Sequence, residues 1–351
     1  MKIAAVPETL LERLITLAGL APTPIVDTFH AMIVARAVMV ATKLGVFEAL
    51  ADGPCTAPEV ACQLGVDGRA TEKLLNVLVA TRYLRFRGGR YALTRLARRW
   101  LLRQSPWSVH DNMLLRFMEW QAVETLEDFV RTGKSLDVHD MIRDDQWEVY
   151  QRGMRALARL SADEVVRRVP VPANARAMLD VGGGHGHYAV AFCRRYPQLQ
   201  ATILDLPAAI EAAAPILAED AMKGRVTHRS GDASTDDLGE NAWEFVFMSH
   251  VVHHFDEATN AAFVRRAERA LRPGGVLAVL DVLRPESPTG TGQTGALLDL
   301  YFAITSNAGT WSDKEITQWQ IEAGLQPGKH ISLRSAPGIT VMTATKLSNR
   351  V

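Results

Sequence analysis

Residues Ala177 to Tyr188 read AMLDVGGGHGHY, and this stretch decides the fold. A short apolar run ends in an acid, three glycines follow, and a helical pattern begins at Tyr188. That order predicts a strand, a tight turn and a helix. Glycines allow positive φ and let the backbone come close to a ligand. The N-terminus of the following helix offers unpaired N–H groups and a partial positive charge, so the stretch predicts a site for a polar ligand.

The spacing of the glycines distinguishes between two ligand classes. A dinucleotide fingerprint needs glycine at the last position of Gly-x-Gly-x-x-Gly, but His187 stands there. Asp205 ends the next predicted strand, where a carboxylate can accept hydrogen bonds from ribose hydroxyls. Asp180, just before the glycines, suits a ligand with a cationic end. We therefore expect S-adenosylmethionine, held by Asp180, Gly182, Gly184 and Asp205. A purely structural turn is the alternative.

Strand and helix patterns alternate from residue 175 onward, which predicts a doubly wound α/β sheet with a ligand crevice at the carboxyl ends of its strands. The later strands are expected at 201–204, 225–229, 244–249, 276–282, 328–333 and 339–345. The helices between them are expected at 188–195, 208–218, 257–271, 295–306 and 313–323. The turn at 336–338 joins the last two strands, so we expect a hairpin and one antiparallel edge strand.

The first hundred residues have a different pattern. A helix is expected at 8–18, and a long helical segment at 25–50 is apolar on most faces, as in a helix buried between subunits. Two helices at 56–65 and 69–82 and a hairpin at 83–93 follow, in the order of a winged helix. Such a unit can bind DNA, but the second helix lacks a basic stripe. A structural role in a dimer is the favoured interpretation.

Composition excludes several classes of protein. The 351 residues carry no net charge, so no overall field favours nucleic acid or an anionic membrane. The three cysteines form no disulfide framework or metal motif and fit a reducing compartment. Arg36 and Lys43 interrupt the longest apolar region, 31–50, and the N-terminus has no signal-peptide pattern. We expect a cytoplasmic protein without membrane or nucleic-acid partners.

These segments together resemble a known family. The stretches at 179–186, 205–207, 231–232, 250–257 and 271–275 are similar to the S-adenosylmethionine-dependent small-molecule O-methyltransferases, which include caffeate, acetylserotonin and bacterial natural-product enzymes. The resemblance covers nearly the whole chain and is specific for fold and cofactor, but not for substrate. It implies a homodimer with three parts. These are a winged-helix-like dimerisation domain at 1–105, a helical linker and substrate wall at 106–172, and a Rossmann-like methyltransferase domain at 173–351.

The resemblance also assigns residues at the later strand ends. Asp232 matches the acid that accepts from the adenine amino group, and Ala233 and Ser249 stand at two further cofactor positions. The family usually has methionine and lysine at these two positions, so the packing against the cofactor differs here. A solvated turn residue is the alternative for Asp232.

His253 is the candidate catalytic base. Methyl transfer to a phenol requires removal of its proton, and an imidazole with a pKa near ~6.5 suits that task. The family has His-Asp-Trp where this chain has His253, His254 and Phe255, and it has an acid at Asp281 that orients the base. Although His250 lies close by in sequence, no further ligand motif accompanies these histidines, so no metal is expected. Asp299 and Asn307 lie on a helix expected to line the substrate cavity, and a second family acid falls near 310–313.

The sequence therefore predicts a methyltransferase acting on a hydroxyl of a small, partly aromatic molecule. Three alternatives stay open. A relative of the same fold could methylate carbon or nitrogen, where a base is less necessary. Some relatives bind S-adenosylmethionine but perform other chemistry. A winged-helix regulator that senses a ligand is the third, and the neutral charge argues against it.

Overall fold

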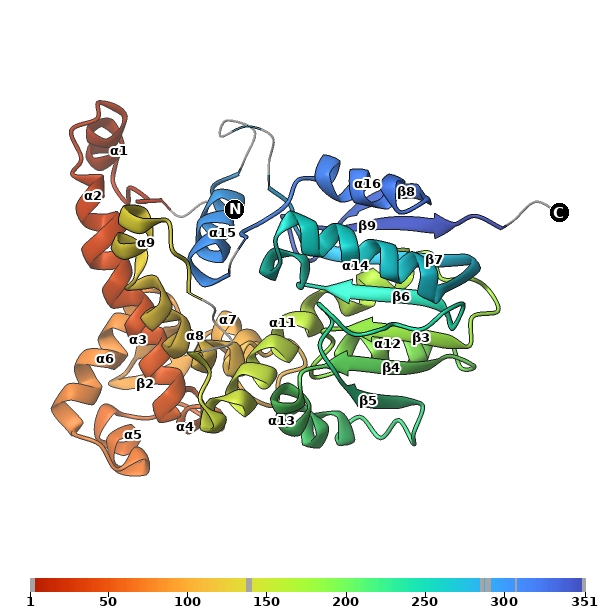
Figure 1. The fold of residues 1–351 in the computed structure, drawn as a ribbon. Helices are drawn as coiled ribbons and strands as arrows, with labels where there is room; N and C mark the ends of the chain where they lie inside the picture. Colours follow the sequence, from red (N-terminus) through yellow and green to blue (C-terminus); the bar gives the residue numbers. More distant parts are fainter. Residues whose placement is uncertain (1–3, 137–140, 285–286, 288–291, 307, 349–351) are drawn as a thin grey trace. The chain divides into compact units, whose positions relative to one another are not determined.

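The computed structural model describes residues 4–136, 141–284, 287, 292–306 and 308–348, and the chain divides into two compact units after Met118. Figure 1 traces the elements of both units along the chain. The three-part division expected from the sequence, with boundaries after residues 105 and 172, stays a prediction.

The first unit contains the helices and the hairpin expected from the sequence (Figure 1). Capping boxes at Thr9 and Thr56 start α1 and α5, and Gly45 ends α3 with φ of 84°. The long helical segment is not uniform, because the π-helical turn η1 lies within it. The elements are α1 Leu10–Leu17, α2 Thr23–Ile25, η1 Val26–His30, α3 Ala31–Leu44, α4 Val46–Ala49, α5 Ala57–Leu64, α6 Gly68–Ala80, β1 Leu84–Arg87, β2 Arg90–Leu93 and α7 Arg95–Trp100.

The core of this unit is small and apolar, built around the fully buried Phe47, Leu50, Leu75 and Leu78. In contrast, α1 buries no residue at all. The helical segment Thr23–Leu44 is long and apolar enough to cross a membrane by length and composition, with 22% of its most apolar window buried. A helix that packs against a second protein chain has the same composition.

The second unit is built on a seven-stranded sheet with the order β5-β4-β3-β6-β7-β9-β8, which confirms the doubly wound class. The strands are β3 Ala177–Val181, β4 Gln200–Asp205, β5 Val226–Ser230, β6 Trp243–Ser249, β7 Leu271–Val282, β8 Leu325–Ser332 and β9 Ile339–Lys346. The sequence predicted one antiparallel strand at an edge of the sheet, and its predicted place at the edge is wrong. β9 is the antiparallel strand and lies between β7 and β8, so the edge strand β8 runs parallel to the rest. A helical crossover carries the chain to the edge before the final hairpin turns back.

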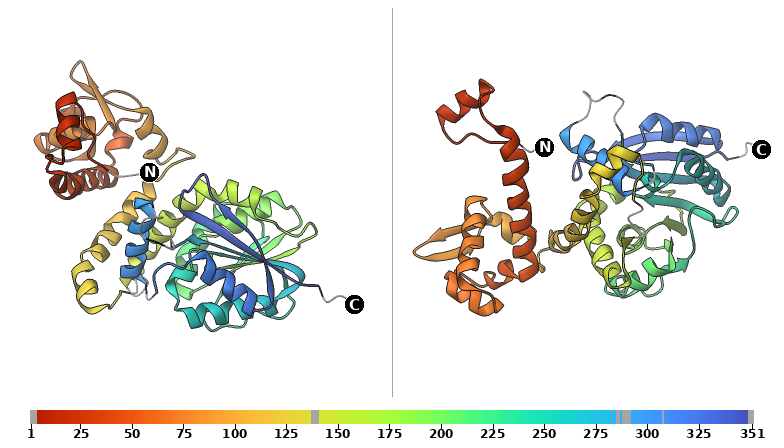
Figure 2. Two further views of the ribbon diagram at one scale, coloured as in Figure 1. Left: turned by 90° about the horizontal axis from the view of Figure 1, so that it is seen from above. Right: turned by 60° about the vertical axis from the view of Figure 1, so that its left-hand side comes forward.

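Helices cover both faces of the sheet (Figure 2). Residues of α11 and α12 contribute to the core on one face, and residues of α14 and α16 to the core on the other. Asp256 caps α14, accepting from the backbone N–H of Thr259 at 2.8 Å. The helices after the unit boundary are α9 Leu126–Thr132, α11 Trp147–Arg168, α12 His187–Arg195, α13 Pro207–Ala218, α14 Glu257–Ala270, α15 Gln293–Thr305 and α16 Asp313–Glu322, while α8 His110–Val123 crosses the boundary.

Candidate active site

The glycine turn between β3 and α12 leaves no room for side chains. Gly182, Gly184 and Gly186 all have positive φ, of 64°, 41° and 69°. A Cβ on Gly182 would lie 2.5 Å from a methyl group of Val251, and one on Gly184 would lie 2.5 Å from Oε1 of Gln151. The turn therefore fits between the loop after β6 and helix α11, and only glycine satisfies both the backbone angle and the space.

Side chains from two further strands hold Gly184 in place. Its N–H donates to Oδ2 of Asp205 at 2.7 Å, and its carbonyl accepts from Nε2 of His228 at 2.8 Å. Asp205 also accepts from the N–H of Leu206 at 2.8 Å. A carboxylate has about four acceptor positions, so Asp205 keeps capacity for a ligand hydroxyl. The structure thus brings together Gly184 and Asp205, two residues that the sequence assigns to one site.

Asp180 lies directly beneath the turn. It is only 1% exposed, and neither carboxylate oxygen has a hydrogen-bond partner within the described part of the chain. Burial, and to a lesser extent the charge of Asp205, raise the pKa of Asp180 to about 8. The backbone N–H of Ala189 has the opposite effect on this pKa, although it does not form a hydrogen bond with the carboxyl. A cationic ligand group above the turn would compensate this buried carboxyl.

Two histidines of the turn are neutral at neutral pH. Burial lowers the pKa of His185 to about 3 and that of His187 to about 4, with neighbouring His187 and arginine charges acting further on His185. Nδ1 of His185 accepts from the N–H of His187 at 3.1 Å. The imidazoles therefore add no positive charge that would repel a cationic ligand.

The remaining predicted cofactor residues lie at neighbouring strand ends. Asp232 follows β5, is exposed, and accepts at Oδ1 from the N–H and hydroxyl of Ser234 at 2.7 and 2.6 Å. Ala233 packs against the core on the α14 face. Ser249 ends β6. The order of the strands places Asp232, Asp205 and the glycine turn in a row along one edge of the sheet.

This row fits the expected cofactor. S-adenosylmethionine carries a ribose diol, a cationic sulfonium and a zwitterionic amino-acid end. Asp205 supplies an acceptor at the end of β4. The unpartnered Asp180 supplies a buried carboxyl under the turn, and a cationic ligand would favour its ionised form. The glycines supply a backbone that a ligand can approach closely.

His253 and Asp281 form a buried pair at the ends of β6 and β7. Nδ1 of His253 lies 2.9 and 3.0 Å from the two oxygens of Asp281, and the residues are 3% and 1% exposed. Burial by itself would raise the pKa of Asp281, but the charge of His253, its hydrogen bonds to the carboxylate and the nearby His250 hold that pKa well below its usual range. Because an ionised carboxylate only accepts, the imidazole carries its proton on Nδ1 and leaves Nε2 as a base.

Neighbouring elements fix the loop that carries this histidine. The ring of His253 stacks on Phe302 of α15 at 3.9 Å, and the hydroxyl of Ser306 donates to its carbonyl at 2.8 Å. Nε1 of Trp311 and Nδ2 of Asn260 both donate to the carbonyl of Val252, each at 2.9 Å. The position of the base is therefore set by α14, α15 and the segment before α16.

His250 joins the same cluster from a left-handed backbone conformation, with φ of 57°. Its Nδ1 lies 3.7 Å from Asp281, and one ligand atom from each of His250, His253 and Asp281 lies within 4.8 Å of the others. Two imidazoles and a carboxylate are a ligand set that divalent transition metals accept. Asp281 is distant from the two histidines in sequence, so the three residues form no recognisable metal motif. The expected absence of a metal stays a prediction.

The second acid expected near 310–313 stays a prediction. Thr310, which is 1% exposed, donates its hydroxyl to Asp299 of α15. Asp313 instead starts α16 and lies 3.6 Å from His330. Asn307 lies outside the described residues.

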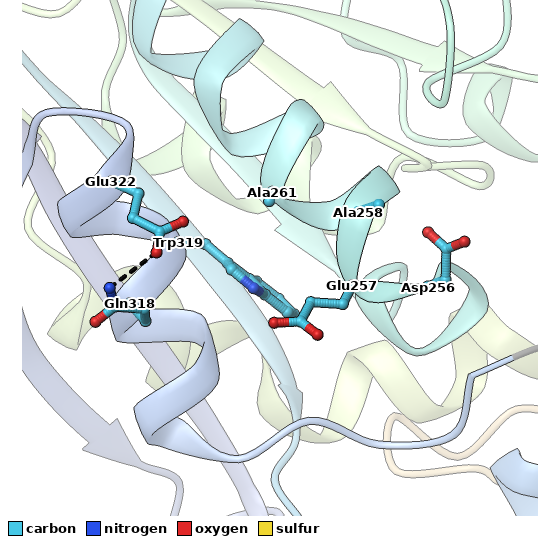
Figure 3. Close-up of a pocket in the computed structure, with 7 residues that line it drawn as sticks. All are labelled: Asp256, Glu257, Ala258, Ala261, Gln318, Trp319 and Glu322. Carbon is cyan, nitrogen blue, oxygen red and sulfur yellow. Dashed lines mark hydrogen bonds between the residues drawn. The ribbon is translucent and has the colours of Figure 1, made fainter.

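A half-open cleft of about 480 Å³ lies away from these groups, between α14 and α16 (Figure 3). Its wall carries the carboxylates of Asp256, Glu257 and Glu322 around the indole of Trp319. None of the predicted catalytic or cofactor residues lines it. We therefore assign the chemistry to the strand ends rather than to this cleft.

Sequence reasoning missed Gln151 and His228, which both touch Gly184. A signal for Gln151 exists. The buried face of α11 follows the spacing of residues 151, 155, 158, 162 and 165, and its first two members are Gln151 and Arg155 where apolar residues are expected. His228 lies on β5, the strand at one edge of the sheet. Polar residues are common on an edge strand, so this histidine does not indicate a functional role from the sequence.

The geometry defines a methyltransferase-like doubly wound domain with a glycine turn and a His–Asp pair at its strand ends. Sequence comparison agrees. Residues 121–326 match the O-methyltransferase domain and residues 26–103 match the O-methyltransferase dimerisation domain, so the chain belongs to the O-methyltransferase family.

Several characterised proteins are similar to the chain. A 3-hydroxy-5-methyl-1-naphthoate 3-O-methyltransferase of Streptomyces sahachiroi is 27% identical over 92% of this chain and 94% of its own length. An L-tyrosine C(3)-methyltransferase of Streptomyces lavendulae is 25% identical over 82% of each chain. The crystal structure of human N-acetylserotonin methyltransferase in complex with S-adenosylmethionine superposes with a TM-score of 0.83 at 19% identity, covering 98% of this chain and 100% of that one.

Proposed function

We propose that this protein transfers the methyl group of S-adenosylmethionine to a hydroxyl of a small aromatic molecule, with His253 as the general base. The observation that carries the proposal is the buried His253–Asp281 pair, whose Nδ1–oxygen distances are 2.9 and 3.0 Å. The matched O-methyltransferase domain and the aromatic substrate named for the Streptomyces sahachiroi relative support it.

S-adenosylmethionine supplies an electrophilic methyl group bound to a sulfonium. Nε2 of His253 takes the proton of the substrate hydroxyl as its oxygen attacks that carbon, the C–S bond breaks, and the electron pair stays on the thioether. Asp281 stabilises the imidazolium that forms and keeps the ring oriented. Phe302, stacked on His253, provides an aromatic surface beside the reacting oxygen.

The first experiment measures cofactor binding. Calorimetry should detect binding of S-adenosylmethionine to the wild type and a strong loss in Asp205→Ala, because this carboxylate faces the ribose position. If the wild type bound neither the cofactor nor its demethylated product, the methyltransferase proposal would fail. Hydroxylated aromatic compounds are then screened for the mass of one added methylene.

The second experiment tests the base. His253→Gln and Asp281→Asn should each reduce kcat by about 100-fold to 10,000-fold, which is the usual contribution of general base catalysis. Cofactor affinity should stay within a few-fold of the wild type in both variants. Unchanged kcat in His253→Gln would remove this residue from the base role.

Carbon methylation is a second candidate, favoured by the similarity to an L-tyrosine C(3)-methyltransferase. Removal of a phenolic proton also activates the neighbouring ring carbons, so the same His253–Asp281 pair would serve. Fragmentation of the product separates the two candidates, because only an O-methyl product has lost the free hydroxyl.

We also propose that the protein is a homodimer. The matched dimerisation domain begins at residue 26, and Phe29, Met32 and Ile33 within it are 54%, 47% and 40% exposed in the single chain. Side chains of this size are stabilised when a second copy covers them.

A further inference from the structure

The buried face of α11 contains an unexpected polar end. Gln151, Arg155, Ala158, Ala162 and Val165 follow one another at helical spacing, and all are at most 5% exposed. The last three pack in the apolar core, as a helix face against a sheet requires. Gln151 and Arg155 lie at the N-terminal end of the stripe, where α11 reaches the glycine turn.

Arg155 fixes this end of the helix. Its guanidinium donates to Glu219 at 2.6 Å and to Asp220 at 2.8 Å, just after α13. Farther along α11, the hydroxyl of Ser161 lies 2.8 Å from that of Tyr188 on α12. These contacts hold α11 against α12 and α13, so Gln151 has a defined position one turn before Arg155.

The amide of Gln151 faces the turn without a partner. Its Oε1 and Nε2 lie 2.5 and 3.0 Å from the position that a Cβ on Gly184 would take. The residue is 3% exposed, and the described residues offer its amide no hydrogen bond. A ligand that forms hydrogen bonds with this amide would be stabilised by them.

The strand order says which part of a ligand meets Gln151. Asp232 follows β5 and Asp205 ends β4, so an adenosine held by these two acids lies over the outer strands. Its 5′ substituent then extends toward β3 and the glycine turn, where Gln151 lies above Gly184 and Asp180 lies beneath. The 5′ substituent of the cofactor ends in an ammonium and a carboxylate.

We propose that Gln151 recognises the amino-acid end of the cofactor, with Nε2 donating to the carboxylate or Oε1 accepting from the ammonium. An amide suits this task because it offers a donor and an acceptor without a charge. The proposal rests on the cofactor assignment of the proposed function and adds a binding residue from outside the strand-end loops.

The test compares two ligands that differ only at this end. S-adenosylhomocysteine has the amino-acid end, whereas 5′-methylthioadenosine keeps the adenosine and the sulfur but lacks it. Calorimetry would be run on the wild type, Gln151→Ala and Gln151→Met, the last of which preserves the side-chain length. Arg167→Gln, on the exposed face of the same helix, is the matched control.

We expect S-adenosylhomocysteine to bind both Gln151 variants about 10-fold or more weaker than it binds the wild type. Binding of 5′-methylthioadenosine should be unchanged, and Arg167→Gln should behave as the wild type with both ligands. Equal weakening of both ligands, or no weakening of either, would overturn the proposal. If the wild type bound neither ligand, the cofactor assignment itself would be wrong, which distinguishes the two failures.

Discussion

Asp180 is a carboxyl group that the folded protein keeps uncharged. It lies 1% exposed beneath the glycine turn, and its pKa is raised to about 8. The ordinary value is 3.8, so the folded chain retains a proton that the unfolded chain releases above about pH 4. Since the unfolded state then binds fewer protons, the ligand-free protein loses stability as the pH rises from about 4 to about 8.

Replacing Asp180 with asparagine removes this dependence. We expect the Tm of Asp180→Asn to exceed that of the wild type at pH near 8 and to converge with it near pH 4, because both chains are then uncharged at this position. Thermal unfolding followed by circular dichroism at a series of pH values measures the difference. Asp163→Asn, an exposed acid of α11, is the control and should show no such trend. A Tm difference independent of pH would contradict the raised pKa.

Part of the site was predictable from sequence because it follows the chain locally. Asp205, His253 and Asp281 each stand at the end of a recognisable strand, and parallel strands bring their carboxyl ends to one edge. Gln151 and His228 were not predictable in this way. Both side chains lie beside Gly184, which is more than 30 residues away from each in the sequence. A contact with a glycine backbone leaves no pattern in the sequence.

At the scale of elements, α11 borders the glycine turn and is joined to its neighbours by polar contacts. Beyond Arg155 and Ser161, its Glu164 accepts from the N–H groups of Arg334 and Ser335 at 3.0 and 2.8 Å. Although its burial raises the pKa, these backbone donors and the Ser335 hydroxyl lower it to about 2. The carboxylate thus joins the end of α11 to the turn after β8.

Glu164→Gln should lower the free energy of unfolding by about 2–3 kcal/mol at neutral pH, because several donors lose a charged acceptor. The wild-type advantage is full above pH about 4.5 and disappears as the pH falls through about 2. Urea denaturation at several pH values measures it. Glu148→Gln, which breaks the exposed pair with Arg152 on the same helix, is the control and should cost at most about 0.5 kcal/mol.

The sequence predicts elements better than their arrangement. Caps such as Thr56 and Asp256 and glycine stops such as Gly45 act within one turn, so helix limits follow from neighbouring residues. β9 lies between β7 and β8 because it pairs with a strand about 60 residues earlier in the sequence. The residue pattern of β9 does not indicate which strand it pairs with. The π-helical turn at Val26–His30 likewise has no local marker.

At the scale of the whole molecule, the first unit leaves several large apolar side chains exposed. Leu10, Leu14 and Leu17 on α1 are 74%, 57% and 76% exposed, and Phe29 and Ile33 follow on η1 and α3. An amphipathic helix with no buried residue gains little stabilisation from packing within one chain. A second copy of the chain would provide such packing.

We expect the wild type to sediment as a dimer and the double variant Phe29→Asp, Ile33→Asp to sediment largely as a monomer, because two charges would be buried without partners. Analytical ultracentrifugation over a range of concentrations measures the change. Ile321→Asp on α16, at a site that is 53% exposed, should leave the mass unchanged. A wild type that remains monomeric at all concentrations would refute the homodimer.

The contacts of α15 have a consequence for engineering. The helix supplies the ring that stacks on His253, and Ser306, directly after it, donates to the carbonyl of that residue. We expect the same helix to border the acceptor, so acceptor choice and support of the base cannot be exchanged separately. Grafting α15 from a relative to obtain a new acceptor would displace the imidazole. Libraries that keep Phe302 and Ser306 while varying their neighbours should therefore yield more active catalysts than whole-helix chimeras.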